Sequence, residues 1–136
     1  MEKETVLVIE DSSYLAESLI DMLDMHGHNP IHCATGREGV AAALEQHPSL
    51  VLLDIRLPDI SGYEVYRQIR NGDWGANAKI MVLTASESIE NIAQNIDLPR
   101  ADVLFKPDWS MKQLAEIIEK KIATPMTPPP QVESEL

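Results

Sequence analysis

Short apolar runs that alternate with longer amphipathic segments constrain this fold more than any other feature of the sequence. Residues 5 to 122 contain five such pairs, and the run at 50–53, Leu-Val-Leu-Leu, is apolar at every position. A strand that is apolar on both faces is typical of a parallel sheet with helices on both sides. The alternation indicates βα units joined by right-handed crossovers. The sequence therefore predicts an α/β fold with a five-stranded parallel sheet, whose central strand is the run at 50–53.

Periodicity and turn residues give approximate bounds for these elements. Gly27 is suited to end the first helix, and Ser110 is suited to cap the start of the last one. The expected strands are 5–10, 30–34, 50–54, 79–84 and 101–105, and the expected helices are 13–26, 36–46, 62–71, 87–96 and 110–122.

The composition changes at Ala123, where a proline-rich stretch without helical or strand periodicity begins. We expect residues 1–122 to form one globular domain and residues 123–136 to form a disordered tail or linker. The stretch either ends the protein or leads to a second domain, and the sequence leaves both alternatives open.

The chain is acidic, with 22 Asp and Glu against 11 Lys and Arg and a formal net charge of −11. Such a surface repels nucleic acid and anionic membranes, so we expect no direct binding to either. A single cysteine, Cys33, rules out an internal disulfide, and no leader-like or membrane-spanning stretch is visible. These features favour a cytoplasmic protein.

Four of the expected strands end on residues suited to phosphoryl chemistry. Glu10-Asp11 follows the first strand, Asp54 the third, Thr84 the fourth, and Lys106-Pro107 the fifth. Because the carboxyl ends of parallel strands meet at one sheet edge, we expect these side chains to form one pocket. That pocket would hold three carboxylates, a hydroxyl and an ammonium group.

Carboxylates crowded at one edge repel one another, and a hard divalent cation relieves that repulsion. Mg²⁺ is the natural candidate, with Asp11 and Asp54 as direct ligands and Glu10 acting through water. A carboxylate can also attack phosphorus to give an aspartyl-phosphate if the developing charge is neutralised. Lys106 would neutralise part of that charge, and Thr84 would donate a hydrogen bond to a phosphoryl oxygen.

These motifs resemble the response-regulator receiver domain. The resemblance covers residues 5 to 122 and depends on all the motifs occurring in this order at strand ends. The motifs are Glu10-Asp11, Asp54 with Leu57-Pro58 and Ser61-Gly62, Thr84-Ala85, and Lys106-Pro107.

The resemblance implies a flavodoxin-like, doubly wound sheet with strand order 2-1-3-4-5. It implies that Asp54 is phosphorylated and that Thr84 and Lys106 bind the phosphoryl oxygens. It also implies a Mg²⁺ site and a Lys106-Pro107 peptide bond in the cis form. The implied metal ligands are Glu10, Asp11, Asp54 and the backbone carbonyl of Arg56.

The resemblance further implies a signalling role rather than an enzymatic one, beyond the domain's own phosphorylation and dephosphorylation. The phosphoryl donor would be a sensor histidine kinase, a phosphotransfer protein or a small phosphodonor. The output would be contact with a downstream protein or with an appended output domain, with a homodimer through residues 86–122 as a further expectation.

The chain departs from the family pattern at Val103, where members commonly carry Tyr or Phe that moves together with the residue equivalent to Thr84. It also has Pro99-Arg100 where the family favours Gly-Ala. An alternative hypothesis is therefore a receiver-fold interaction module whose output is uncoupled from phosphorylation.

Three other hypotheses fit the sequence less well. A zinc site at His26, His28, His32 and Cys33 is disfavoured because adjacent strand residues point to opposite faces. A phosphatase of the haloacid dehalogenase type needs Asp-x-Asp after the first strand, which Glu10-Asp11-Ser12 does not supply. A flavin carrier would place the flavin phosphate against Glu10 and Asp11.

Overall fold

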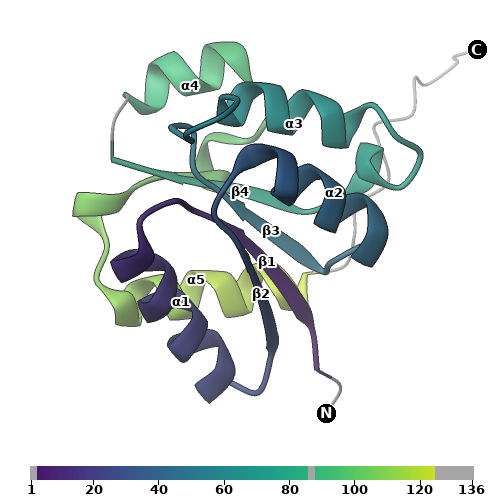
Figure 1. Ribbon diagram of the computed structural model, residues 1–136. Helices are drawn as coiled ribbons and strands as arrows, with labels where there is room; N and C mark the ends of the chain where they lie inside the picture. Colours follow the sequence, from purple (N-terminus) through teal and green to yellow (C-terminus); the bar gives the residue numbers. More distant parts are fainter. Residues whose placement is uncertain (1–2, 86–87, 125–136) are drawn as a thin grey trace, which may run out of the picture.

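The sheet of the computed structural model has five parallel strands in the order β2-β1-β3-β4-β5. The structure describes residues 3–85 and 88–124. This order confirms the flavodoxin-like topology and places β3 at the centre of the sheet (Figure 1). The strands are β1 (Thr5–Ile9), β2 (Asn29–Cys33), β3 (Leu50–Leu53), β4 (Ile80–Thr84) and β5 (Val103–Phe105).

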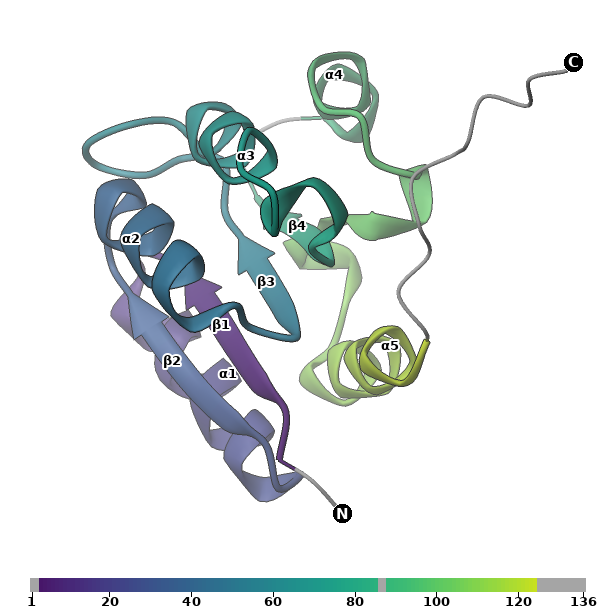
Figure 2. The same ribbon diagram turned by 90° about the vertical axis from the view of Figure 1, so that its right-hand side faces the viewer.

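Helices cover both faces of this sheet. Helices α1 and α5 lie on one face, and α2, α3 and α4 lie on the other (Figures 1 and 2). Three short 3-10 turns, η1 (Gly75–Asn77), η2 (Arg100–Asp102) and η3 (Lys106–Asp108), lie in the loops flanking β4 and β5. The α-helices are α1 (Ser13–Met25), α2 (Gly36–Gln46), α3 (Gly62–Arg70), α4 (Ile89–Asn95) and α5 (Met111–Ala123).

Each sheet face has its own apolar core. On one face Val8 and Leu52 pack with residues of α1 and α5, such as Leu19 and Ile118. On the other face the alternate strand residues, such as Leu53, pack against α2 and α3. All four residues of β3 are buried, which confirms the interpretation of its uninterrupted apolar run.

The capping residues expected from the sequence are present. Ser110 accepts a hydrogen bond from the Gln113 N–H, and the Gln113 side chain accepts one from the Ser110 N–H, so α5 starts with a complete capping box. Gly27 follows α1 with φ +82°, a conformation that glycine adopts without strain.

The region before β5 differs from the expectation. We expected a strand over 101–105, but Arg100–Asp102 forms the turn η2 and the strand contains only Val103–Phe105. The turn is closed by the Asp102 N–H, which donates to the Pro99 carbonyl at 2.9 Å. The fourth helix was expected over 87–96 and spans Ile89–Asn95, with residue 87 outside the described ranges.

No α-helix within residues 3–85 and 88–124 combines the length and apolar character needed to cross a membrane.

Candidate functional site

The strand register brings the acidic residues to one edge of the sheet. Ile9 pairs with Leu53, so Glu10 and Asp54 each directly follow one residue of that pair. The Asp54 N–H donates to the Ile9 carbonyl at 3.1 Å, which continues the ladder past the end of β3. Residues from two separate βα units therefore meet at the carboxyl edge, as the sequence predicted.

Glu10, Asp11 and Asp54 form a compact carboxylate cluster. One carboxylate oxygen from each lies within 4.8 Å of the others, and no other acidic, histidine or cysteine group in the described ranges forms such a cluster. Glu10 is 3% exposed and Asp54 is 6% exposed, whereas Asp11 faces solvent. The cluster therefore has a buried floor and one accessible carboxylate.

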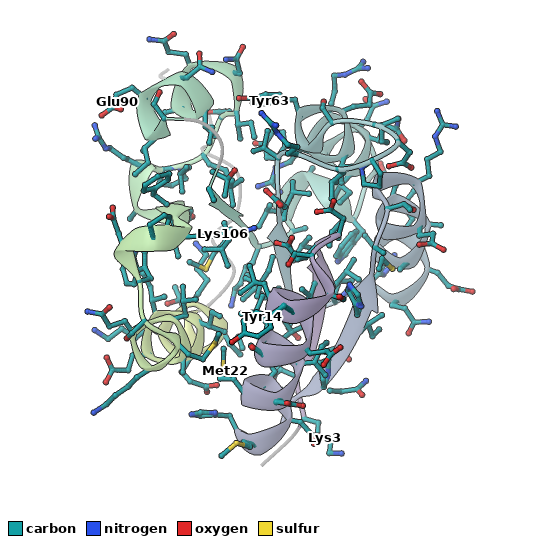
Figure 3. All side chains as sticks on the ribbon, turned by 60° about the vertical axis from the view of Figure 1, so that its left-hand side comes forward. Lys3, Tyr14, Met22, Tyr63, Glu90 and Lys106 are labelled. Atoms are coloured by element: carbon teal, nitrogen blue, oxygen red, sulfur yellow. The ribbon has the colours of Figure 1, made fainter. Side chains whose placement is uncertain are left out.

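Lys106 joins the two buried carboxylates. Its Nζ lies 2.7 Å from Glu10 Oε1 and 3.2 Å from Asp54 Oδ2. The side chain extends from the end of β5 toward the ends of the central strands (Figure 3). A single ammonium group thus partly compensates the negative charge of the cluster.

Burial disfavours the charged forms of Glu10 and Lys106, whereas the hydrogen bond between them favours those charged forms. Burial raises the pKa of Glu10, and the negative charge of Asp54 adds to that rise, so these effects outweigh the hydrogen bonds from Lys106 and the Ser12 N–H. For Lys106, burial disfavours the charged form, but the hydrogen bond to Glu10 and the charge of Asp54 together raise the pKa. Lys106 is therefore held in its ammonium form.

Two contacts that were not predicted from the sequence orient Glu10. The Ser12 N–H donates to Glu10 Oε2 at 3.0 Å, in the turn that leads into α1. The Nε2 atom of His32 lies 2.8 Å from the Glu10 carbonyl oxygen. The Ser12 contact is local, whereas the His32 contact joins the residue after β1 to β2, and no sequence pattern predicts it.

The loop after Asp54 is held by close backbone packing and by Asp59. A Cβ atom added to Gly62 would lie 2.4 Å from the Asp54 carbonyl oxygen, so only glycine fits there. The Asp59 carboxylate accepts hydrogen bonds from the N–H groups of Gly36 at 2.7 Å and Arg37 at 2.9 Å. Partial burial opposes ionisation of Asp59, but these backbone donors prevail and lower its pKa to about 2.

Arg56 and Thr84 lie where the sequence placed them. The Arg56 N–H donates to Asp54 Oδ1 at 3.4 Å, so the backbone of Arg56 lies beside the acidic cluster. Thr84 is the last residue of β4 and is fully buried.

Val103 is 2% exposed and lies in a cluster with Ile55, Val82, Ile92 and Ile96. Phe105, two residues along β5, is only partly buried. The role of Thr84 and Val103 as a switch pair stays a prediction.

The prediction of a cis Lys106-Pro107 bond is wrong, because the residues that the structure describes contain no cis peptide bond. Lys106–Asp108 forms the turn η3, with Pro107 in its first positions and the Trp109 N–H donating to the Lys106 carbonyl at 3.1 Å. Proline suits the start of a helical turn because its φ is already fixed and no N–H is needed there. The turn therefore forms with the trans bond.

The histidines that suggested zinc have other partners. His28 Nε2 lies 2.6 Å from Glu119 Oε2, and His26 Nδ1 lies 2.8 Å from the Met22 carbonyl oxygen. Cys33 packs at the edge of the core formed with α2 and α3. The sequence-based rejection of a zinc site therefore agrees with the positions of these residues.

The fold and the acidic cluster define a receiver-type signalling domain, and comparison with known proteins agrees. The response regulator receiver domain matches residues 6–119. The chain therefore belongs to the response-regulator receiver domain family.

Similar curated proteins include transcriptional regulators. The chain is 37% identical over 117 residues to the uncharacterized transcriptional regulatory protein YkoG of Bacillus subtilis, covering 86% of this chain and 50% of that protein. It is 29% identical over 112 residues to the DNA-binding dual master transcriptional regulator RpaA of Synechocystis, covering 82% of this chain and 46% of RpaA. This chain thus spans about half the length of these relatives.

Solved structures with the same fold include the receiver domain of the sensor histidine kinase PA1611 from Pseudomonas aeruginosa. It has 27% identity and a TM-score of 0.79, with 90% of this chain and 100% of that chain covered, and it holds a magnesium ion in its active site cleft. The receiver domain of a LuxO repressor protein from Vibrio parahaemolyticus has 26% identity and a TM-score of 0.76, covering 89% of this chain and 91% of that one.

Proposed function

We propose that this domain accepts a phosphoryl group on Asp54 and signals through protein contacts. The observation that carries the proposal is the position of Asp54 between a cationic group and two further carboxylates at the carboxyl edge of the sheet. A carboxylate in this setting is suited to attack phosphorus, because the ammonium group of Lys106 lies close enough to stabilise the phosphoryl oxygens.

The donor set fits Mg²⁺. Hard divalent ions prefer oxygen ligands, and the Glu10, Asp11 and Asp54 carboxylates lie within reach of a common centre. We infer that these three residues and the backbone carbonyl of Arg56 would hold the ion. Bound Mg²⁺ would supply part of the charge neutralisation that phosphoryl transfer to a carboxylate needs.

The other residues of the site have separate roles in the proposal. Lys106 would move its hydrogen bonds from the carboxylates to the phosphoryl oxygens, and Thr84 would donate a hydrogen bond to the same group. Glu10 is held in place by the Ser12 N–H, so the acidic cluster is oriented before a ligand binds. The chemistry of the domain would be limited to its own phosphorylation and dephosphorylation.

The donor would be a sensor histidine kinase, a phosphotransfer protein or a small phosphodonor. Similar domains occur both in transcriptional regulators and in a sensor histidine kinase. A downstream protein target or an appended output domain would then read the signal, in the cytoplasm. A homodimer through residues 86–122 is a further prediction, and two residues of that range lie outside the described ranges.

The first experiment is phosphorylation of the purified protein with a radiolabelled small phosphodonor in the presence of Mg²⁺. We expect acid-stable, base-labile label in the wild type and none in Asp54→Asn. Asp21→Asn, which changes a solvent-exposed carboxylate on α1, is the control and should label normally. Equal labelling of wild type and Asp54→Asn would overturn the assignment of the phosphoacceptor.

A second experiment tests whether phosphorylation is coupled to output. Beryllofluoride with Mg²⁺ imitates the aspartyl-phosphate, and amide NMR spectra record which residues respond. Spectral changes that extend from the site into residues 88–122, and that are absent in Asp54→Asn, support a working switch despite Val103. Changes confined to residues near 10, 11, 54, 84 and 106 would instead support the uncoupled interaction module.

A further inference from the structure

An open groove of about 590 Å³ runs between α3 and α4, away from the acidic cluster. Figure 3 places Tyr63 on the side of α3 that faces α4. The proposed phosphoryl chemistry makes no use of this groove. Its lining includes Tyr63, Tyr66, Arg67, Asn71, Asn95 and Asp97.

The lining combines tyrosine rings with hydrogen-bond donors. The Tyr66 hydroxyl donates to the Asp97 carbonyl at 2.9 Å, and the guanidinium of Arg70 lies 5.1 Å from the centre of the Tyr66 ring. These contacts fix the ring on the groove floor. Arg67 is exposed and is paired with Glu64 on the same helix. Aromatic grooves with such donors bind polyproline II segments, whose backbone carbonyls make no hydrogen bonds of their own.

Helix α5 ends at the same edge of the sheet as α3 and α4, although it packs on the opposite face. The crossover helices run antiparallel to the strands, so α3, α4 and α5 all end at the sheet edge opposite the acidic cluster (Figure 2). The Lys79 ammonium donates to the carbonyls of Lys121 at 3.0 Å, Ile122 at 2.9 Å and also Thr124. Thr124, the last described residue, is thereby anchored beside the start of β4.

A short chain of contacts then leads from this anchor to the groove. Ala78 precedes Lys79, and its carbonyl accepts a hydrogen bond at 2.6 Å from Arg70, which is itself a groove residue. Thr124 is therefore linked through Lys79 and Ala78 to Arg70, at the end of the groove that Asn71 lines.

The sequence beyond Thr124 has the composition that such a groove recognises. Residues 125–130 are Pro-Met-Thr-Pro-Pro-Pro, which contains the spacing Pro-x-x-Pro. Extended as polyproline II, the proline-rich residues 125–130 would span about 19 Å and residues 125–136 about 37 Å, whereas α3 is about 14 Å long. Length therefore does not limit contact with the whole groove. We propose that the proline-rich segment 125–130 docks in the α3–α4 groove of its own chain, across Tyr63 and Tyr66.

Docking of this kind would link the sheet edge where α3 ends to the edge that carries the acidic cluster. The groove begins at Asn71 and Asn95 and reaches Ser61, which caps the start of α3. Ser61 belongs to the loop that follows Asp54. A docked segment would thus contact the helix that starts from the acceptor loop, and any domain attached after residue 136 would leave from this side of the molecule.

Paramagnetic broadening tests the proposal on the full chain without phosphorylation. The single native cysteine is replaced by Cys33→Ser, and a nitroxide is attached at Val132→Cys. We expect loss of amide signal at Tyr63, Tyr66 and Arg67 and no loss at Tyr14, which is exposed in the first turn of α1 beside the acidic cluster, at the sheet edge away from Thr124. Undiminished signal at the groove residues would overturn the proposal.

Two tail variants test the chemistry of recognition. Replacing Pro128, Pro129 and Pro130 together by glycine should restore the groove signals, because the preformed extended conformation is lost. The matched variant Glu133→Gln with Glu135→Gln keeps the prolines and should keep the broadening. If the variant with Glu133→Gln and Glu135→Gln alone abolished the broadening, the attraction would be electrostatic and the proposed recognition of proline would be wrong.

A mixed sample separates docking within one chain from docking between chains. Spin-labelled protein without ¹⁵N is combined with ¹⁵N-labelled protein that carries no spin label. Docking within one chain predicts full-strength groove signals in the mixture. Broadening there would mean that the tail binds a second copy, which would overturn the intrachain proposal.

Discussion

The ammonium nitrogen of Lys106 lies closer to Glu10 than to Asp54, at 2.7 Å against 3.2 Å. These three residues come from the ends of three strands, so the ammonium group connects the central part of the sheet to its β5 edge. It also separates two buried carboxylates that would otherwise repel each other. The balance of charge at this edge therefore depends on one side chain.

Replacing Lys106 should destabilise the metal-free protein. Lys106→Met leaves two buried carboxylates without their shared donor, so we expect a loss of about 1–3 kcal/mol in the free energy of unfolding. Mg²⁺ should recover more stability in the variant than in the wild type, because it would replace the lost positive charge. Urea unfolding with and without Mg²⁺ measures both effects. Lys3→Met, at an exposed position, is the control, and equal unfolding midpoints for Lys106→Met and wild type would contradict the prediction.

A second prediction follows from the close approach of Gly62 to the backbone of Asp54. In Gly62→Ala the new Cβ would meet the Asp54 carbonyl oxygen at 2.4 Å, so the backbone beside the phosphoacceptor must shift. We expect lower thermal stability and slower phosphorylation from a small donor.

Gly72→Ala is the matched control for Gly62→Ala. Its Cβ would meet nothing nearer than 3.8 Å, so both properties should be nearly unchanged. If the two alanine variants behaved alike, the close contact at Gly62 would not control the loop.

Val103 makes a third prediction, about packing. The side chain is buried against Ile55 and Ile92, so a tyrosine at this position would overfill the space. Val103→Tyr should lower the free energy of unfolding by about 1–3 kcal/mol in the unphosphorylated protein. Phe105→Tyr, on the same strand but partly exposed, should cost much less. Urea titration compares the variants, and an unchanged free energy of unfolding for Val103→Tyr would show that the cluster around Val103 accommodates a large ring.

Asp59 makes a fourth prediction, about acid unfolding. Its pKa is about 2 in the folded protein against an ordinary value of 3.8, because backbone N–H groups at the start of α2 hold the ionised form. A lowered folded pKa gives stability that is present above pH 3.8 and is lost as the pH falls through about 2. Asp59→Asn should therefore lower the thermal midpoint near neutral pH.

Thermal unfolding from pH 7 down to pH 2 tests this assignment. The difference between wild type and Asp59→Asn should shrink as the pH falls below about 3.8 toward 2. Asp73→Asn, an exposed loop change, supplies the control. A wild-type advantage that stayed constant over the whole range would show that Asp59 does not act through its charge.

The alternation of apolar runs and amphipathic segments was enough to locate all five strands and all five α-helices, because burial on both sheet faces leaves a local pattern. The same pattern placed Glu10, Asp54, Thr84 and Lys106 at strand ends, and parallel topology then brought those ends to one edge. The start of β5 differed from the prediction, because the turn η2 after Pro99 occupies Arg100–Asp102.

Other features depended on contacts between residues far apart in the chain. The Glu10 carbonyl is held by His32 on the neighbouring strand, and the Asp59 carboxylate accepts hydrogen bonds at the start of α2. No local pattern encodes such contacts, because they depend on how the loops settle once the helices have packed. Local sequence patterns were therefore enough to predict the fold and the side chains gathered at one sheet edge, whereas the packing of strands and loops sets which groups neutralise and orient one another there.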